Sequence, residues 1–207
     1  MNSSTAARPL DEGGPAPIRA PLFALAVEAF EDDRRHVVLD LGRARAGTVE
    51  LFSRYRCRLD VVDLPAHLPE LPDPDDEEQG PAAVERWLDG LLPPARGETV
   101  DLVLCWNLLN YLPPGVIEAL GQRLAERASG QARLHALIEY QATRMPATPA
   151  SFAPAGLELV ADPPGADDAT VAAPRYSPKE LEKRLPGFSS EKTMLLGNGM
   201  QEYLYRR

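Results

Sequence analysis

Residue types that build many enzyme sites are scarce in this chain of 207 residues. It contains two cysteines and three histidines, and only three of its 22 basic residues are lysines. Cys57 and Cys105 lie in separate apolar runs, without the close spacing of a metal knuckle or a redox pair, so we expect two buried, reduced thiols. The histidines have no partner at catalytic spacing. The sequence therefore shows no Ser/His/Asp arrangement and no metal-ligand set.

Long apolar runs are absent as well. No window reaches 18 apolar residues, so we expect no transmembrane helix. The first 21 residues have no basic start that leads into an apolar core, so they do not resemble a secretory signal. We therefore expect a cytoplasmic protein that does not enter a membrane.

Basic charge is in deficit, because 22 Lys and Arg stand against 31 Asp and Glu and the formal charge is −9. A surface of this sign repels phosphate, so duplex nucleic acid is not an expected partner. The imbalance is local: residues 60–90 carry ten acids and one base, whereas residues 34–58 carry seven arginines. We interpret the acidic run at 73–78 as a solvated loop, since like charges repel and stay hydrated.

The remaining composition, 44% hydrophobic and 26% charged, is typical of one globular domain. Glycines and prolines break any periodicity at the N-terminus, which predicts a flexible lead over residues 1–20 before a domain at 21–207. Residues 141–175 contain six prolines and only weak periodicity. We expect a long connection there, with at most one short element.

Hydrophobic periodicity predicts alternating helices and strands. Apolar residues at helical spacing predict helices that start at residue 21 and that cover 48–55, 82–92, 115–128 and 177–185. Short apolar runs predict strands over 36–42, 57–64, 99–105, 134–138, 190–196 and 200–206. Residues 36–64 form a βαβ unit, which implies a parallel sheet. The predicted fold is a single α/β domain with a mostly parallel twisted sheet, helices on both faces and an antiparallel C-terminal hairpin.

A glycine turn follows the first of these strands, in the sequence Asp40-Leu41-Gly42. The helix that follows such a turn offers free backbone N–H groups and a partial positive charge, which suit an anionic or carboxylate group. Asp63 ends the second strand, at the position from which an acid accepts hydrogen bonds from two ribose hydroxyls. The two features together indicate a ligand that contains a nucleoside.

These residues resemble the class I, Rossmann-like S-adenosylmethionine-dependent methyltransferases, whose first motif is Asp-x-Gly-x-Gly-x-Gly after the first strand. Asp40 and Gly42 match its first two positions, Asp63 matches the ribose acid, and residues 100–113 look like the family's fourth strand and following loop. The resemblance covers residues 36–139 and 176–206. It implies a methyltransferase that acts on an unidentified small-molecule or protein acceptor, with no catalytic base assigned. It implies that S-adenosylmethionine is held by Asp40, Gly42, Arg43, Ala44, Asp63, Leu64, Cys105, Trp106 and Asn107.

The chain departs from the family at two places. The later glycines of the motif fall on Ala44 and Ala46, and a methyl group at Ala44 stands where the backbone approaches the amino-acid end of the cofactor; alanine is also penalised at positive φ. No acid aligns with the family's adenine contact, Asp89 being the nearest. These departures are the basis for an alternative, a non-catalytic methyltransferase-like binding or regulatory protein, a pseudoenzyme that has lost tight cofactor binding.

The same residues also fit a dinucleotide site or purely structural roles. The spacing Gly42-x-Ala44-x-x-Gly47 matches a loosened dinucleotide fingerprint, although the Asp40 carboxylate would repel a pyrophosphate. The structural roles are a turn cap for Asp40, an ordinary strand-end acid for Asp63, backbone hydrogen bonding in a tight bend for Asn107 or Asn110, and core packing for Trp87.

Overall fold

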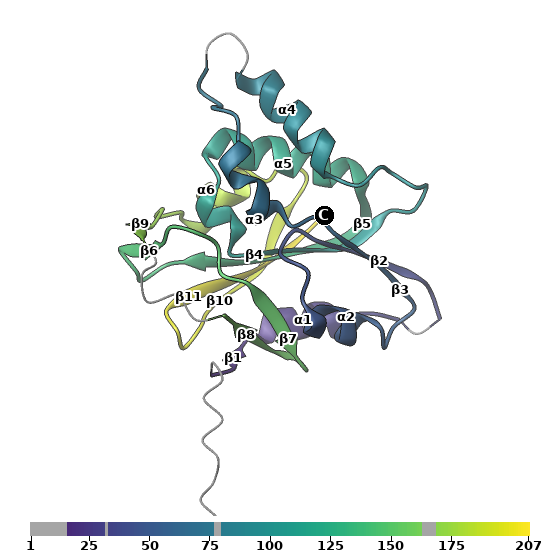
Figure 1. Cartoon of the computed structure of the whole chain (residues 1–207). Helices are drawn as coiled ribbons and strands as arrows, with labels where there is room; N and C mark the ends of the chain where they lie inside the picture. The colour runs from purple at the N-terminus through teal and green to yellow at the C-terminus, as the bar shows by residue number, and fades with distance from the viewer. Residues whose placement is uncertain (1–15, 32, 77–79, 163–168) are drawn as a thin grey trace, which may run out of the picture.

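The structure is a computed structural model that describes residues 16–31, 33–76, 80–162 and 169–207 (Figure 1). The helices are α1 (Pro21–Glu28), α2 (Ala46–Phe52), α3 (Leu64–His67), α4 (Gly80–Leu91), α5 (Pro114–Arg127) and α6 (Pro178–Lys183), with 3-10 helices η1 (Leu68–Glu70) and η2 (Leu108–Tyr111). The strands are β1 (Ile18–Arg19), β2 (His36–Asp40), β3 (Cys57–Val61), β4 (Val100–Trp106), β5 (Ala128–Glu139), β6 (Arg144–Pro146), β7 (Phe152–Ala155), β8 (Glu158–Ala161), β9 (Thr170–Ala172), β10 (Ser189–Leu195) and β11 (Met200–Arg206).

A six-stranded sheet with the order β10-β11-β5-β4-β2-β3 forms the centre of the molecule. The strands from β5 to β3 are parallel, and β11 and β10 are antiparallel to their neighbours. The parallel strands are nearly continuous apolar runs because helices cover both faces, and every residue of β2 is buried. The predicted α/β fold, with its parallel βαβ unit and C-terminal antiparallel hairpin, is confirmed.

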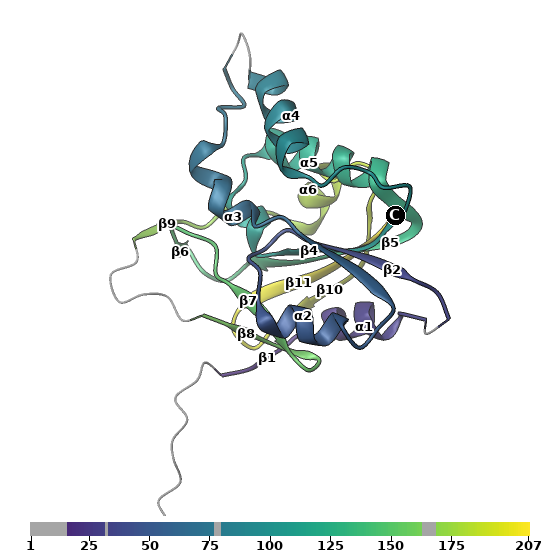
Figure 2. The same ribbon diagram turned by 45° about the vertical axis from the view of Figure 1, so that its right-hand side comes forward.

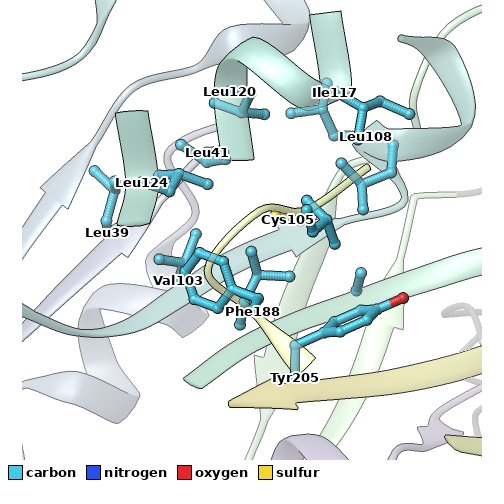
Figure 3. Packing of buried hydrophobic residues seen from close by; sticks show 14 of the residues in the cluster. Leu39, Leu41, Val103, Cys105, Leu108, Ile117, Leu120, Leu124, Phe188 and Tyr205 are labelled. Carbon is cyan, nitrogen blue, oxygen red and sulfur yellow. The ribbon is translucent and has the colours of Figure 1, made fainter. Parts of the chain in front are cut away.

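Successive side chains along each strand point to opposite faces of the sheet, so they belong to two separate cores. On one face, Leu39 and Val103 pack with Leu120 of α5, in a core that α4 and α6 also cover (Figures 1 and 3). On the other face, Val38 and Leu104 belong to a core with α1 and α2, which lie on the opposite side of the sheet in Figure 1.

The order of the strands creates a topological switch point between β2 and β4. From β2 the chain passes through α2 to β3 at one edge of the sheet, and it then returns through α4 to β4 on the other side of β2. Open α/β sheets bind ligands outside the carboxyl ends of the strands at such a point. Asp40 and Trp106 are the last residues of β2 and β4. The fold therefore brings two of the predicted site residues to the same place.

The connection over residues 141–175 is more structured than its sequence predicts. The expectation of at most one short element is wrong, because β6 pairs with β9 and β7 pairs with β8. These strands are three or four residues long, and β6 and β7 each contain a proline, which hides their pattern. Residues 18 and 19 of the predicted N-terminal lead form β1 and pair with β8, whereas residues 1–15 lie outside the described residues.

Three smaller expectations also change. The strand predicted over 134–138 is longer, because β5 begins at Ala128, directly after α5, and that residue already pairs with β4. The strand predicted over 57–64 is shorter, because β3 ends at Val61 and Leu64 starts α3, which η1 follows. Both cysteines are free, but only Cys105 is fully buried; Cys57 is half-buried and its thiol donates to the Phe52 carbonyl.

In the described ranges, no helix has both the length and the apolar character that crossing a membrane requires.

Candidate functional site

Asp40 is the central acid of the switch point, and it is fully buried. Its Oδ1 atom accepts hydrogen bonds from the Gly42 backbone N–H at 2.8 Å and from the Trp106 indole Nε1 at 2.6 Å. Its Oδ2 atom has no hydrogen-bond partner among the described residues. Burial raises the pKa of Asp40 from 3.8 to about 6; the two hydrogen bonds oppose this shift, and the negative charge of Asp63 adds to it.

Asp63 lies next to Asp40 because two loops are joined by backbone hydrogen bonds. The Asp63 N–H donates to the Gly42 carbonyl at 3.1 Å, and the Leu64 N–H donates to the Leu41 carbonyl at 3.0 Å. Asp63 itself has a left-handed backbone, with φ 49° and ψ 47°, where it starts α3. Its Oδ1 atom is buried and has no partner among the described residues. The predicted ribose acid thus presents a free acceptor oxygen beside Asp40.

Trp106 also has a left-handed backbone, with φ 48°, which is rare for a bulky side chain. Its indole is 3% exposed and lies directly on Gly42. A Cβ atom built on Gly42 would stand 2.4 Å from the indole Cδ1 and 2.7 Å from Nε1. Phe152 of β7 stacks on the indole, with ring centroids 6.0 Å apart and an interplanar angle of 11°. The glycine of the first motif is therefore in contact with a side chain of the protein.

The two asparagines after β4 have different roles. The Asn110 side chain donates to the carbonyls of Asn107 and Leu137 and accepts from the Glu139 N–H. This confirms for Asn110 the structural role, hydrogen bonding to backbone in a tight bend. Asn107 is 4% exposed, and its Oδ1 atom has no partner among the described residues. Asn107 thus provides a third buried acceptor oxygen near the switch point.

The loop after Gly42 does not show the strain that its sequence predicts. Arg43 and Ala44 are both exposed. Among the residues that the structure describes, only Asp63 and Trp106 combine a side chain with positive φ, so the expected φ penalty at Ala44 is absent. Gly47 is tighter: a Cβ built there would stand 2.4 Å from the Pro154 carbonyl oxygen of β7. The loop thus adopts its turn without the later glycines of the motif.

Leu64 and Cys105 contribute packing at the site. Both are fully buried in the core on the α5 side of the sheet, and Figure 3 shows Cys105 among the apolar residues of that core, beside Leu108. Burial raises the pKa of the Cys105 thiol far above its usual value, and the charge of Asp40 raises it further.

Asp89, the acid nearest to the family's adenine contact, and Trp87 of the same helix both have partners within the protein. Asp89 of α4 forms a bidentate pair with Arg123 of α5, at 2.9 and 3.2 Å. Trp87 is partly buried against the core on the α5 side, as the core-packing role predicts. The structure therefore assigns no adenine contact to either residue.

Sequence reasoning missed a buried acid–histidine pair beside the site. Glu202 of β11 and His135 of β5 are both fully buried, and His135 Nε2 lies 2.9 Å from Glu202 Oε1. The His135 ring meets the Trp106 indole edge to face, with centroids 6.2 Å apart. The available signal was an acid and a histidine inside two otherwise apolar strands. In the described part of the chain, no three His, Cys, Asp or Glu side chains are grouped so that they could hold a metal ion.

No protein-family model matches this sequence, and no curated protein matches it either. Solved structures with a similar fold are found. The 1,6-didemethyltoxoflavin-N1-methyltransferase of Burkholderia thailandensis is 16% identical, with a TM-score of 0.49 and coverage of 89% of this chain and 77% of that one. An S-adenosylmethionine-dependent methyltransferase from Clostridium acetobutylicum is 12% identical, with a TM-score of 0.48 and coverage of 83% of both chains.

The pyocyanin biosynthetic protein PhzM is 13% identical, with a TM-score of 0.46 over 89% of this chain. The present chain spans only 54% of the length of PhzM. At such identities and TM-scores, these likenesses assign no activity, and a functional conclusion must rest on the residues of the site.

Proposed function

We propose that this protein is an S-adenosylmethionine-dependent methyltransferase that acts on an unidentified acceptor. The observation that supports the proposal is a set of three buried acceptor oxygens to which no described residue donates, Asp40 Oδ2, Asp63 Oδ1 and Asn107 Oδ1. They follow or end three adjacent strands at the carboxyl edge of the sheet. A buried acceptor that lacks a donor costs the folded protein about 1–3 kcal/mol of stability. A ligand that supplies donors at this edge would offset that cost, which favours binding.

S-adenosylmethionine carries the donors that these oxygens lack. Asp63 would accept hydrogen bonds from the ribose hydroxyls, Asp40 would pair with the ammonium group, and Asn107 would line the site. Two carboxylates at one site favour a ligand with positive charge, which both the ammonium and the sulfonium supply. When bound, the cofactor supplies an activated methyl group, and the protein contributes orientation for in-line attack by the acceptor.

The same geometry argues against the dinucleotide interpretation. A pyrophosphate at the glycine turn needs free backbone N–H groups, but the Gly42 N–H already donates to Asp40. An ionised Asp40 would also repel the phosphates. We therefore retain the methyltransferase proposal and leave the acceptor open.

We also infer a cytoplasmic location, which the two free cysteines support.

Calorimetric titration with S-adenosylhomocysteine tests the proposal. Asp63→Asn removes the charge but keeps a residue that tolerates the left-handed backbone, and we expect it to weaken binding by more than about tenfold. Asp89→Asn is the matched control, because Asp89 pairs with Arg123 on the surface of α4 and α5. This variant should bind S-adenosylhomocysteine with the affinity of the unaltered protein. Absence of heat and of any thermal shift at millimolar ligand would overturn the proposal and favour the non-catalytic alternative.

A further inference from the structure

The indole of Trp106 lies on Gly42, beside the Asp40 carboxylate to which the proposed ligand would bind. Because the indole atoms stand within contact distance of the Gly42 Cα, the amino-acid end of a cofactor cannot reach that backbone in the same conformation. The indole also takes the Asp40 Oδ1 acceptor. The site has acceptors that fit the ligand, and a side chain of the protein already donates to one of them.

A segment distant in the sequence holds the indole there. Phe152 of β7 stacks on the outer side of the ring, and Phe23 of α1 lies 5.8 Å from it. Beyond β8, Asp162 forms a bidentate ion pair with Arg45, at 2.6 and 2.8 Å, in the loop that follows Gly42. Figure 2 shows β7 and β8 beside α2, the helix that this loop starts. Phe152 pairs with Ala161, the residue before Asp162, so the same open end of the β7–β8 hairpin binds the glycine loop and packs on the indole.

We propose that Trp106 is a gating residue, a built-in cover that must leave Gly42 before a ligand binds, and that the Arg45–Asp162 pair is the latch that keeps the cover closed. The identity of the ligand in this inference rests on the proposed function. The existence of the cover does not, because contacts within the chain define it.

Two features make the cover displaceable. The left-handed backbone of Trp106 is unfavourable for a bulky residue, and such strain persists only where surrounding contacts enforce it, often at switch regions. The latch is partly exposed, with side-chain exposures of 31% for Arg45 and 49% for Asp162, so water competes for it. By contrast, Leu159 anchors β8 in the core with no exposure. The movement is therefore confined to the two rings and to the end of the hairpin at Asp162.

The bound state compensates for the lost indole contact. The indole offers Asp40 one donor and leaves Oδ2 without a partner, whereas an ammonium group offers three donors and a charge. Ligand binding is then coupled to opening of the cover. Any change that weakens the latch raises the fraction of protein molecules that are open and able to bind the ligand.

Tryptophan fluorescence tests the cover, because the chain has only two tryptophans. In a Trp87→Phe background, Trp106 is the single reporter. We expect blue-shifted emission and weak acrylamide quenching without ligand, and at least an approximately twofold rise in quenching when S-adenosylhomocysteine is bound. If calorimetry shows binding while emission and quenching stay unchanged, the cover does not move and the inference is overturned.

The latch is tested in the same background with Arg45→Gln. We expect ligand-free quenching of Trp106 to rise and the affinity for S-adenosylhomocysteine to increase by about threefold or more, since the closed state is weakened. Arg54→Gln is the matched control, because Arg54 is an exposed arginine that pairs with Glu50 near the end of α2, and it should leave both quantities unchanged.

The two proposals fail in different ways. If neither the background protein nor Arg45→Gln binds S-adenosylhomocysteine, the proposed function fails, and ligand-free quenching alone then decides on the cover. A rise in Arg45→Gln but not in Arg54→Gln supports the cover; equal quenching in the two variants overturns it.

Discussion

Gly42 shows at the scale of a single residue how the site constrains the sequence. A methyl group at this position would overlap the Trp106 indole, at 2.4 Å from Cδ1, and would crowd Asp40 Oδ1 at 3.2 Å. Because the indole is packed on its other sides, it cannot move without losing contacts. We expect Gly42→Ala to lower the free energy of unfolding by about 1–3 kcal/mol, measured by urea denaturation.

Gly90 supplies the control for the same chemical change. It lies in α4, and a Cβ built there meets nothing within 4 Å. Alanine at this position should raise the free energy of unfolding by roughly 0.5–1 kcal/mol, because it restricts the unfolded chain. Effects of the same sign at both glycines would contradict the contact between Gly42 and the indole.

The pattern around Gly42 predicts its importance but not its neighbour. Asp-x-Gly after an apolar strand indicates a tight turn next to a ligand, and the structure places Asp40 and Gly42 in such a turn. The indole contact could not be predicted, because Trp106 is distant in the sequence and adopts a backbone conformation that tryptophan rarely has. The same limit applies to Asn107, whose free oxygen depends on how the bend after β4 packs.

Helix α1 shows at the scale of an element how a remote strand can position the N-terminal face of the site. Its own N-cap residue, Ala20, supplies no side-chain acceptor. Instead, the Glu202 carboxylate of β11 accepts from the N–H groups of Leu22 at 3.0 Å and Phe23 at 2.8 Å, and also contacts His135. Phe23 in turn packs against Trp106. The pair Glu202–His135 therefore fixes one wall of the indole's surroundings.

Removal of this cap should destabilise the fold strongly. Glu202→Ala leaves two backbone donors and a buried histidine without an acceptor, and we expect a loss of about 3–5 kcal/mol in the free energy of unfolding. Hydrogen exchange should also become faster at the amides of Leu22 and Phe23. Glu191→Ala is the control, because Glu191 pairs with Arg133 near the surface and should cost less than about 1 kcal/mol. Equal losses in the two variants would show that the cap is not the source.

The elements that the sequence predicts best are those whose pattern is set by burial on one or both faces. β2 and β4 are nearly continuous apolar runs, and α6 follows the N-cap Ser177, whose side chain accepts from the Glu180 N–H. The strands from β6 to β9 could not be predicted, since each has only three or four residues and prolines interrupt β6 and β7. Because the β7–β8 hairpin covers the indole, the unpredicted part of the fold is also the part that controls the proposed site.

Charge shows at the scale of the whole molecule how a local excess is accommodated. Part of the acidic excess over residues 60–90 is neutralised by arginines: Asp60 pairs with Arg58, and Glu85 and Asp89 pair with Arg123. Glu77 and Glu78 of the predicted solvated loop lie outside the described residues. Asp63 and Asp40 instead face each other at the switch point, where the charge of Asp63 raises the pKa of Asp40. In the described part of the chain, the acids without a basic partner therefore include the two that the proposed ligand requires.

This arrangement makes the stability of the whole molecule depend on pH in an unusual direction. Since the pKa of Asp40 is about 6 in the folded protein and 3.8 as its ordinary value, the folded state binds more protons between these values than the unfolded state does. The contribution of Asp40 to the free energy of unfolding is therefore at its maximum below pH 4. It decreases by at most about 3 kcal/mol as the pH rises through 6.

Asp40→Asn isolates this contribution, because asparagine keeps an acceptor for Gly42 and Trp106 but carries no charge. We expect the variant to equal the unaltered protein in free energy of unfolding near pH 4 and to exceed it by about 1–3 kcal/mol at pH 8, from urea denaturation across that range. If the free energies of unfolding of the two proteins changed with pH in parallel, the pKa of Asp40 would not be raised in the folded protein. A gain at pH 8 together with loss of S-adenosylhomocysteine binding would mean that the fold retains an unfavourable buried charge because a cationic ligand needs it.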